Sequence, residues 1–306
     1  MDLCRSRDGS PCPVGFVGDL SDPWVVAIAE ALALDRPIER ISCEGPLPDR
    51  PFGENPPSAL VLHRHRLSLA DAARLSEWRA SSSGIHLTLV VSPFARYEEA
   101  ERAATVVDSI VSEAIAAEVL PGRLARLLDG DRRTAPTSAR PTCLVEVASG
   151  DPELAQMLAE VCTRAGYPTR IIDDRRIGGD PPSTAPDRML TLWDLPVLES
   201  GWPRRLQGRT LQTGPTIALA GFADRETVAL AREAGAFACL ELPCELEDLV
   251  DAIDRAVLQT PLSDWPTARR ADSAHRLPTP RRKPALRPEL AVVSRWSDPE
   301  PTPTMP

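Results

Sequence analysis

The sequence alternates short apolar runs with helical stretches of about 10–15 residues, and it does so twice over. Such alternation predicts βαβ units, because consecutive parallel strands need a crossover that is usually helical. The first block predicts strands at residues 14–17, 38–42, 59–63, 87–92 and 107–111, with helices at 22–34, 69–80, 96–104 and 115–128. The second predicts strands at 143–147, 169–172, 189–193, 215–220 and 237–242, with helices at 151–165, 224–234 and 245–257.

Each block has the length and pattern of a flavodoxin-like, doubly wound α/β domain. We expect a five-stranded parallel sheet with helices on both faces, five strands and five helices in about 115 residues. In this fold, functional side chains gather at the carboxyl ends of the strands. The candidate site residues are therefore those that follow each strand.

Local signals fix some helix ends. Asp151 and Pro152 supply an N-cap and a proline at the first helical position. Pro203 falls inside the helix expected at 201–208, which predicts that this helix is short. The stretch 175–187 carries no periodic pattern and is predicted to be a loop.

Proline and glycine divide the chain into five parts. Residues 1–12 are polar and predicted to be disordered, and residues 129–142 read as a linker. Between and after them lie two domains of nearly equal length, 13–128 and 143–259. Residues 260–306 form a Pro/Arg-rich tail that is expected to be disordered.

Composition excludes several classes of function. The net charge of -9 and pI of about 5.1 argue against a general binder of nucleic acid or of anionic membranes. No apolar run reaches the ~18 residues that span a bilayer, and the start has no signal-like apolar region. Seven scattered cysteines, an odd number, are typical of reduced thiols, so a cytoplasmic location is expected.

One residue type is almost missing. Lys283 is the single lysine among the 35 basic residues, and it lies in the tail. Chemistry that needs a lysine within a folded site is thereby excluded, including a P-loop, a kinase phosphate lysine and a Schiff base.

The second block resembles the receiver domain of bacterial response regulators. Residues 215–236, PTIALAGFADRETVALAREAGA, are similar to the family's fourth strand, fourth helix and Glu-Ala-Gly-Ala turn. Residues 239–249, CLELPCELEDL, are similar to its fifth strand, Lys-Pro step and fifth helix, and residues 151–154 to the start of its first helix. The first block resembles the same fold through its pattern alone.

The resemblance implies a phosphoryl-transfer site that can be checked position by position. Receivers carry a phosphoacceptor Asp after strand three, two Mg²⁺-binding acids after strand one, a hydroxyl residue after strand four and a Lys after strand five. Cations are needed because carboxylates and a phosphoryl group otherwise repel. In the second block Asp194 stands at the acceptor position, but the remaining positions hold Ser149, Gly150, Ala220 and Leu242.

The first block departs from the pattern differently. Asp19 could be one of the acids, and Ser92 stands at the hydroxyl position. The acceptor position is His63, and Ser112 and Glu113 replace the Lys-Pro step. Both blocks are therefore identified as degenerate, or pseudo-, receivers. No cofactor is expected, except Mg²⁺ if Asp194 is phosphorylated.

Several candidates have a structural alternative. Asp194 is either a phosphoacceptor or a strand-end acid that caps a helix or pairs with Arg. Asp151 either offers a carboxylate to a metal, together with Asp194, or caps its helix. Residues 63–66 (HRHR) are a metal or phosphate site, or else a basic loop beside Asp19, since the sequence shows no third ligand. Cys239 and Cys244 are a weak zinc pattern or buried thiols.

The favoured function is a signal-transduction module of the response-regulator type, a pseudo-receiver that docks proteins without phosphorylation. The family docks a sensor kinase, an output protein or a second receiver through its fourth helix, fifth strand and fifth helix, and a homodimer is one option. The alternative is a phosphorelay receiver that accepts a phosphoryl group on Asp194.

A third hypothesis is an enzyme or small-molecule binder that uses the strand-end crevice. Neither first strand is followed by a Gly-rich phosphate loop, so no enzymatic activity is expected. In the tail, residues 279–284 suit a partner groove or a solvated end.

Overall fold

The computed structural model describes residues 13–34, 36–49, 57–81, 84–93, 95–129, 143–177 and 188–261, which form two five-stranded sheets. The first half contains β1 (Val14–Gly18), α1 (Pro23–Ala33), β2 (Ile38–Ser42), β3 (Ala59–Arg64), α2 (Leu69–Ser81), β4 (His86–Val91), α3 (Tyr97–Ala104), β5 (Ser109–Ser112) and α4 (Glu113–Asp129). The second contains β6 (Leu144–Ser149), α5 (Pro152–Arg164), β7 (Thr169–Asp173), the 3₁₀ turn η2 (Asp174–Arg176), β8 (Met189–Asp194), α6 (Trp202–Thr213), β9 (Thr216–Ala220), α7 (Arg225–Glu233), β10 (Ala238–Glu241) and α8 (Leu246–Gln259).

All strands are parallel, and both sheets have the same winding. The order is β2-β1-β3-β4-β5 in the first half and β10-β9-β8-β6-β7 in the second. In each half the chain starts on an inner strand of the sheet, moves to one edge and then crosses to the other, which is the flavodoxin-like order. The predicted fold class is confirmed.

Within the described residues each half has four α-helices rather than five, because no α-helix joins the second strand to the third in that part of the chain. The predictions for residues 1–12, 130–142, 178–187 and 262–306 lie outside the described residues. None of the described helices is long and apolar enough to cross a bilayer.

Helices cover both faces of the first sheet because its strand residues alternate between two cores. Phe16, Ala59 and Val61 pack with α1 and α4, whereas Leu60 and Leu62 join a separate cluster with Leu75 and Trp78 of α2. The alternation follows from the period of two along a strand. Full burial of both faces explains why the strands read as continuous apolar runs.

The prediction of a short helix at 201–208 is wrong. Helix α6 runs for 12 residues, and Pro203 lies in its first turn. A proline there costs nothing, because the first N–H groups of a helix have no intrahelical partner. The helix passes through Gly208 and ends instead at Gly214, whose φ of 121° is open to glycine.

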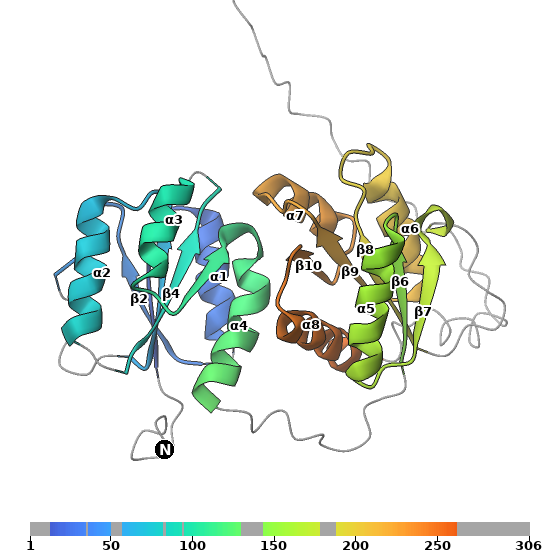
Figure 1. The fold of residues 1–306 in the computed structure, drawn as a ribbon, viewed down its shortest axis with the longest axis horizontal. Coiled ribbons are helices and arrows are strands. Elements are labelled where there is room, and N and C mark those ends of the chain that lie inside the picture. The colour runs from blue at the N-terminus through green and yellow to red at the C-terminus, as the bar shows by residue number, and fades with distance from the viewer. Residues whose placement is uncertain are drawn as a thin grey trace, which may run out of the picture.

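Helix α4 joins the two halves. It packs on α1 in its own half and on α7, β10 and α8 of the other half (Figure 1). Buried residues on both sides of this contact, including Ala116, Leu120 and Leu124 of α4 and Ile253 of α8, belong to one continuous apolar cluster. The halves therefore share a core, and their separation would expose it to water.

Charged groups surround this shared core. Asp248 of α8 is buried and accepts hydrogen bonds from Arg123 Nε and Nη2 (2.9 and 2.6 Å) and from Arg126 Nη2 (2.8 Å), both on α4. Arg126 also pairs with Asp251. A Cβ on Gly122 would lie 2.7 Å from Asp251 Oδ2, so glycine allows α4 and α8 to approach closely.

We predict that Asp248→Ala lowers the free energy of unfolding by about 2–4 kcal/mol, because it removes the buried carboxylate that two partly buried guanidinium groups share. Urea denaturation followed by Trp fluorescence measures the change. The matched control, Asp251→Ala, removes a more exposed carboxylate from the same helix and should cost under about 1 kcal/mol. Equal losses in the two variants would contradict the importance of Asp248 at this interface.

Candidate functional site

Asp194 lies where β8 ends, at the carboxyl edge of the second sheet. Its half-buried carboxylate accepts a hydrogen bond from Ser149 Oγ at 2.7 Å. Ser149 ends β6, the neighbour of β8, so the sheet register brings the two residues together. The predicted acceptor position, Asp194, and one of the predicted acidic-pair positions, Ser149, are thus adjacent. At the acidic-pair position, however, the structure has a hydroxyl group in place of a carboxylate.

The charged groups that act on Asp194 are negative. Burial raises the pKa of Asp194, the Ser149 hydrogen bond partly offsets this, and the charges of Asp151 and Asp174 raise it further. Among the described residues Asp194 forms no ion pair, so the alternative in which it pairs with Arg is not what the structure has. Nor does it cap a helix in this part of the chain.

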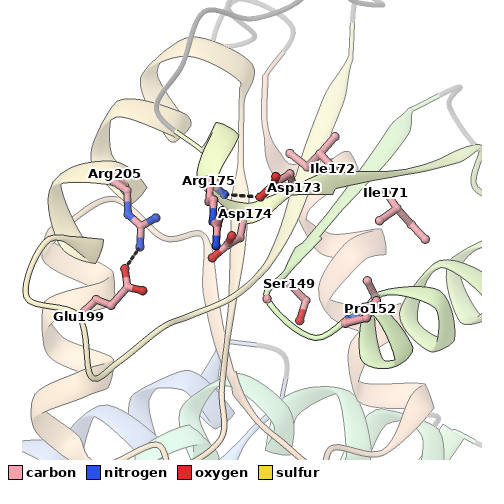
Figure 2. A pocket seen from close by; sticks show the side chains of 11 residues that line it. Ser149, Pro152, Ile171, Ile172, Asp173, Asp174, Arg175, Glu199 and Arg205 are labelled. Carbon is pink, nitrogen blue, oxygen red and sulfur yellow. Dashed lines mark hydrogen bonds and ion pairs between the residues drawn. The ribbon is translucent and has the colours of Figure 1, made fainter.

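A hollow of about 620 Å³ opens next to this strand end (Figure 2). Its wall includes two arginines that the sequence analysis did not single out. Arg205 of α6 binds Glu199 at 2.7 Å and stacks over the Trp193 ring, 5.2 Å from its centroid. Arg175 of η2 stands beside the hollow as well. Neither arginine is among the groups that shift the pKa of Asp194.

The residues present do not fit an Mg²⁺ ion held by protein ligands. Asp151 Oδ1 accepts hydrogen bonds from the backbone N–H groups of Glu153 and Leu154 (2.8 and 3.3 Å) and so caps α5. Of the two alternatives given for Asp151, the structure therefore has the helix cap. In the described part of the chain, no three ligand groups around Asp194 lie within coordinating distance of one another. A hard cation such as Mg²⁺ needs several oxygen ligands close together. The carboxylates that line the hollow, those of Asp173, Asp174 and Glu199, form no such group.

The remaining positions of the second half carry no chemistry. Ala220 is fully buried, and the peptide bond between Leu242 and Pro243 is cis. Cys239 and Cys244 are free thiols whose pKa burial raises to about 12 and about 11. Cys239 is buried and Cys244 is half-buried, and neither belongs to a metal-ligating group of three among the described residues.

The strand end of the first half is built around a histidine. His63 is the last residue but one of β3, and its Nε2 lies 2.6 Å from Oε2 of Glu113, which begins α4; both side chains are buried. His65 Nδ1 is 3.9 Å from the same oxygen. Asp19 accepts hydrogen bonds from the N–H and the hydroxyl of Ser21 (2.9 and 2.6 Å), and the charge of His65 also acts on it.

A cation from the second half enters this strand end. Arg225, the first residue of α7, binds Glu113 and donates to Asp22 Oδ2 at 2.6 Å. Burial alone would raise the pKa of Glu113, but the hydrogen bonds and charges of His63 and Arg225 hold it at about 2. Sequence reasoning missed Arg225 because 112 residues separate it from Glu113 along the chain.

Comparisons with known proteins were made at three levels. No family model and no curated protein matches the chain. A Burkholderia thailandensis protein named for pilus assembly (cpaE) is 22% identical, with a TM-score of 0.33, over 38% of this chain and 98% of its own. A CheY-like response regulator from Mesorhizobium loti is 20% identical, with a TM-score of 0.32, over 37% and 96%.

A third structure, the C-terminal part of E. coli RcsC, contains a linker region and a phosphoreceiver domain. It is 14% identical, with a TM-score of 0.29, over 86% of this chain and 96% of that one. Receiver domains are thus among the structural neighbours at low identity. The class of the protein, a pair of flavodoxin-like α/β folds, rests on its own strand order.

The raised pKa of Asp194 predicts how a neutral substitute behaves. A raised pKa means that the folded state disfavours the anion, a penalty that appears as pH rises through the unfolded value of 3.8 and persists above the folded value. Asp194→Asn should therefore raise the melting temperature at pH 7, and the gain should fade by about pH 3.

Calorimetry at the two pH values checks this. Glu160→Gln, which removes one exposed charge from α5, is the control and should change stability by under about 0.5 kcal/mol. A lower melting temperature for Asp194→Asn at pH 7 would mean that a cation compensates the carboxylate.

We also predict that Arg225→Gln destabilises the protein by about 1–3 kcal/mol, because buried Glu113 loses a charged partner across the interface. Urea denaturation gives the loss. Arg205→Gln is the control, since its partner Glu199 is largely exposed, and it should cost under about 1 kcal/mol. If both variants lose the same amount, Arg225 does not hold the halves together.

Proposed function

We propose that this protein is a signal-transduction module of the response-regulator type that acts by docking proteins without being phosphorylated. One observation carries the proposal: neither strand end combines an acceptor carboxylate with the charges that a phosphoryl group needs. Asp194 faces the carboxylates of Asp151 and Asp174 and bonds only to a hydroxyl among the described residues. A dianionic phosphoryl group there would add to the repulsion.

The first half supports the same function. The position that corresponds to the phosphoacceptor, near the end of its third strand, holds His63, whose Nε2 already contacts Glu113. Arg225 of the other half binds the second oxygen of that carboxylate. This strand end serves to join the halves, which leaves no free acceptor carboxylate there.

The docking face that receivers use is occupied within this chain. In the second half, α7, β10 and α8 correspond to the fourth helix, fifth strand and fifth helix, and α4 of the first half packs on them (Figure 1). Of the docking partners that the family likeness suggests, a second receiver-like unit, the first half of the same chain, occupies this face. A sensor kinase or an output protein would dock on the surfaces that remain exposed.

A phosphorelay receiver that uses Asp194 remains the second candidate. It is favoured by the position of Asp194 at the strand end, half exposed beside an open hollow. The carboxylates of Asp151 and Asp174 are close enough to raise its pKa, so a cation would be attracted to this place. Its need for a cation supplied from solution separates it from the leading proposal.

One experiment decides between the two. The full chain is incubated with acetyl phosphate and Mg²⁺, the reaction is quenched in acid, and the mass of the intact protein is measured by mass spectrometry. A receiver domain that is known to be phosphorylated is treated in the same way as a positive control. We expect no added phosphoryl group on this chain while the positive control gains one. A gain that disappears in Asp194→Asn would overturn the proposal in favour of the phosphorelay.

A further inference from the structure

Three side chains at the carboxyl edge of the first sheet meet in a metal-ligating arrangement. His63 and His65 follow one another on and after β3, and Glu113 begins α4. Their ligand atoms all lie within 4.8 Å of one another, and this is the one such group of three in the described part of the chain. We propose that His63, His65 and Glu113 bind a divalent transition-metal ion of the zinc type.

The observed distances are close to those of a coordinated ion. Ligands that lie about 2.0–2.1 Å from a tetrahedral zinc are about 3.3 Å from one another. Glu113 Oε2 is 2.6 Å from His63 Nε2 and 3.9 Å from His65 Nδ1, values on either side of that separation. Shifts of less than an ångström in each side chain would therefore accommodate the ion.

His65 supplies an independent observation. Its side chain is 43% exposed, yet its Nδ1 atom is buried and has no hydrogen-bond partner. A buried polar atom without a partner costs free energy, so such atoms call for an explanation. A metal ion placed between Nδ1, Glu113 Oε2 and His63 Nε2 would supply the missing partner.

The groups behind the ligands are arranged as they are around protein-bound metals. His65 Nε2 faces Asp22 Oδ2 at 3.8 Å, and metal-bound histidines usually direct their second nitrogen to a carboxylate. The other oxygen of Glu113 is held by Arg225, and Arg225 is held in turn by Asp22. These contacts orient the ligands and balance the charge of Arg225.

The donor set selects the class of ion. Two imidazole nitrogens and one carboxylate oxygen suit zinc, cobalt, nickel or copper, whereas magnesium and calcium prefer oxygen alone. Three protein ligands leave a fourth position for water, which the exposed side of His65 can admit. The ion would share Glu113 with Arg225 and so sit where the two halves meet.

The inference is independent of phosphorylation, and metal binding itself tests it. Zn²⁺ is titrated into the full chain against a chromophoric chelator, and Co²⁺ is added separately for its visible spectrum. We expect one ion per chain and tetrahedral Co²⁺ bands without thiolate charge-transfer absorption. Zn²⁺ should also raise the melting temperature, because it binds the folded state.

Substitution of the exposed ligand keeps the test falsifiable. His65→Ala should weaken Zn²⁺ binding by about ten-fold or more and abolish the melting-temperature shift, while the chain stays folded by circular dichroism. His86→Ala, which removes a histidine of β4 outside the group, should bind Zn²⁺ as the wild type does. Equal affinity of the wild type and His65→Ala, thiolate absorption in the Co²⁺ spectrum, or no binding at all would each overturn the proposal.

Discussion

Burial of α4 between two sheets is the constraint on which the rest of the structure depends. Helix α4 packs beside α1 on the face of the first sheet that is turned toward the second half, and it also packs on α7, β10 and α8 of that half, so two domains of ordinary size share one core. Its polar rim is specified by charge: Arg123 and Arg126 meet Asp248 on one side, and Glu113 meets Arg225 at the helix start. Apolar area provides the affinity, and the ion pairs fix the register.

The two strand ends of the molecule are opposite in charge arrangement. In the second half the carboxylate of Asp194 lies close enough to those of Asp151 and Asp174 for their charges to raise its pKa. In the first half a histidine holds that place, and the carboxylate Glu113 has moved to the residue after the fifth strand. The same fold therefore presents one edge suited to attract cations from solution and another already bound to a cation of the protein itself.

Much of the fold could be predicted from sequence because its signals are local. Strand runs, the Asp151–Pro152 helix start and the alternation itself depend on neighbours in the chain. Pro203 shows where local reasoning fails. A proline interrupts a helix when it lies in the helix interior but is tolerated in the first turn, and the sequence alone did not show that α6 begins next to Pro203. Asp194 could be placed at a strand end, whereas the positions of Arg205 and Arg175 in the wall of the neighbouring hollow depend on how α6 and η2 pack. Glu113, the third ligand that the sequence did not show for HRHR, follows a strand two places along the sheet from the one that carries His63, and only the sheet order brings them together.

The double burial of α4 also limits how such a pair can evolve. If either half were transferred alone to another protein, the apolar stripe of Ala116, Leu120 and Leu124 or its counterpart on α8 would face water and invite aggregation. A recombination breakpoint between the halves is thus disfavoured even though a segment of chain separates them. A larger or polar side chain in place of Leu120 or Leu124 would therefore disturb the packing of both halves at once.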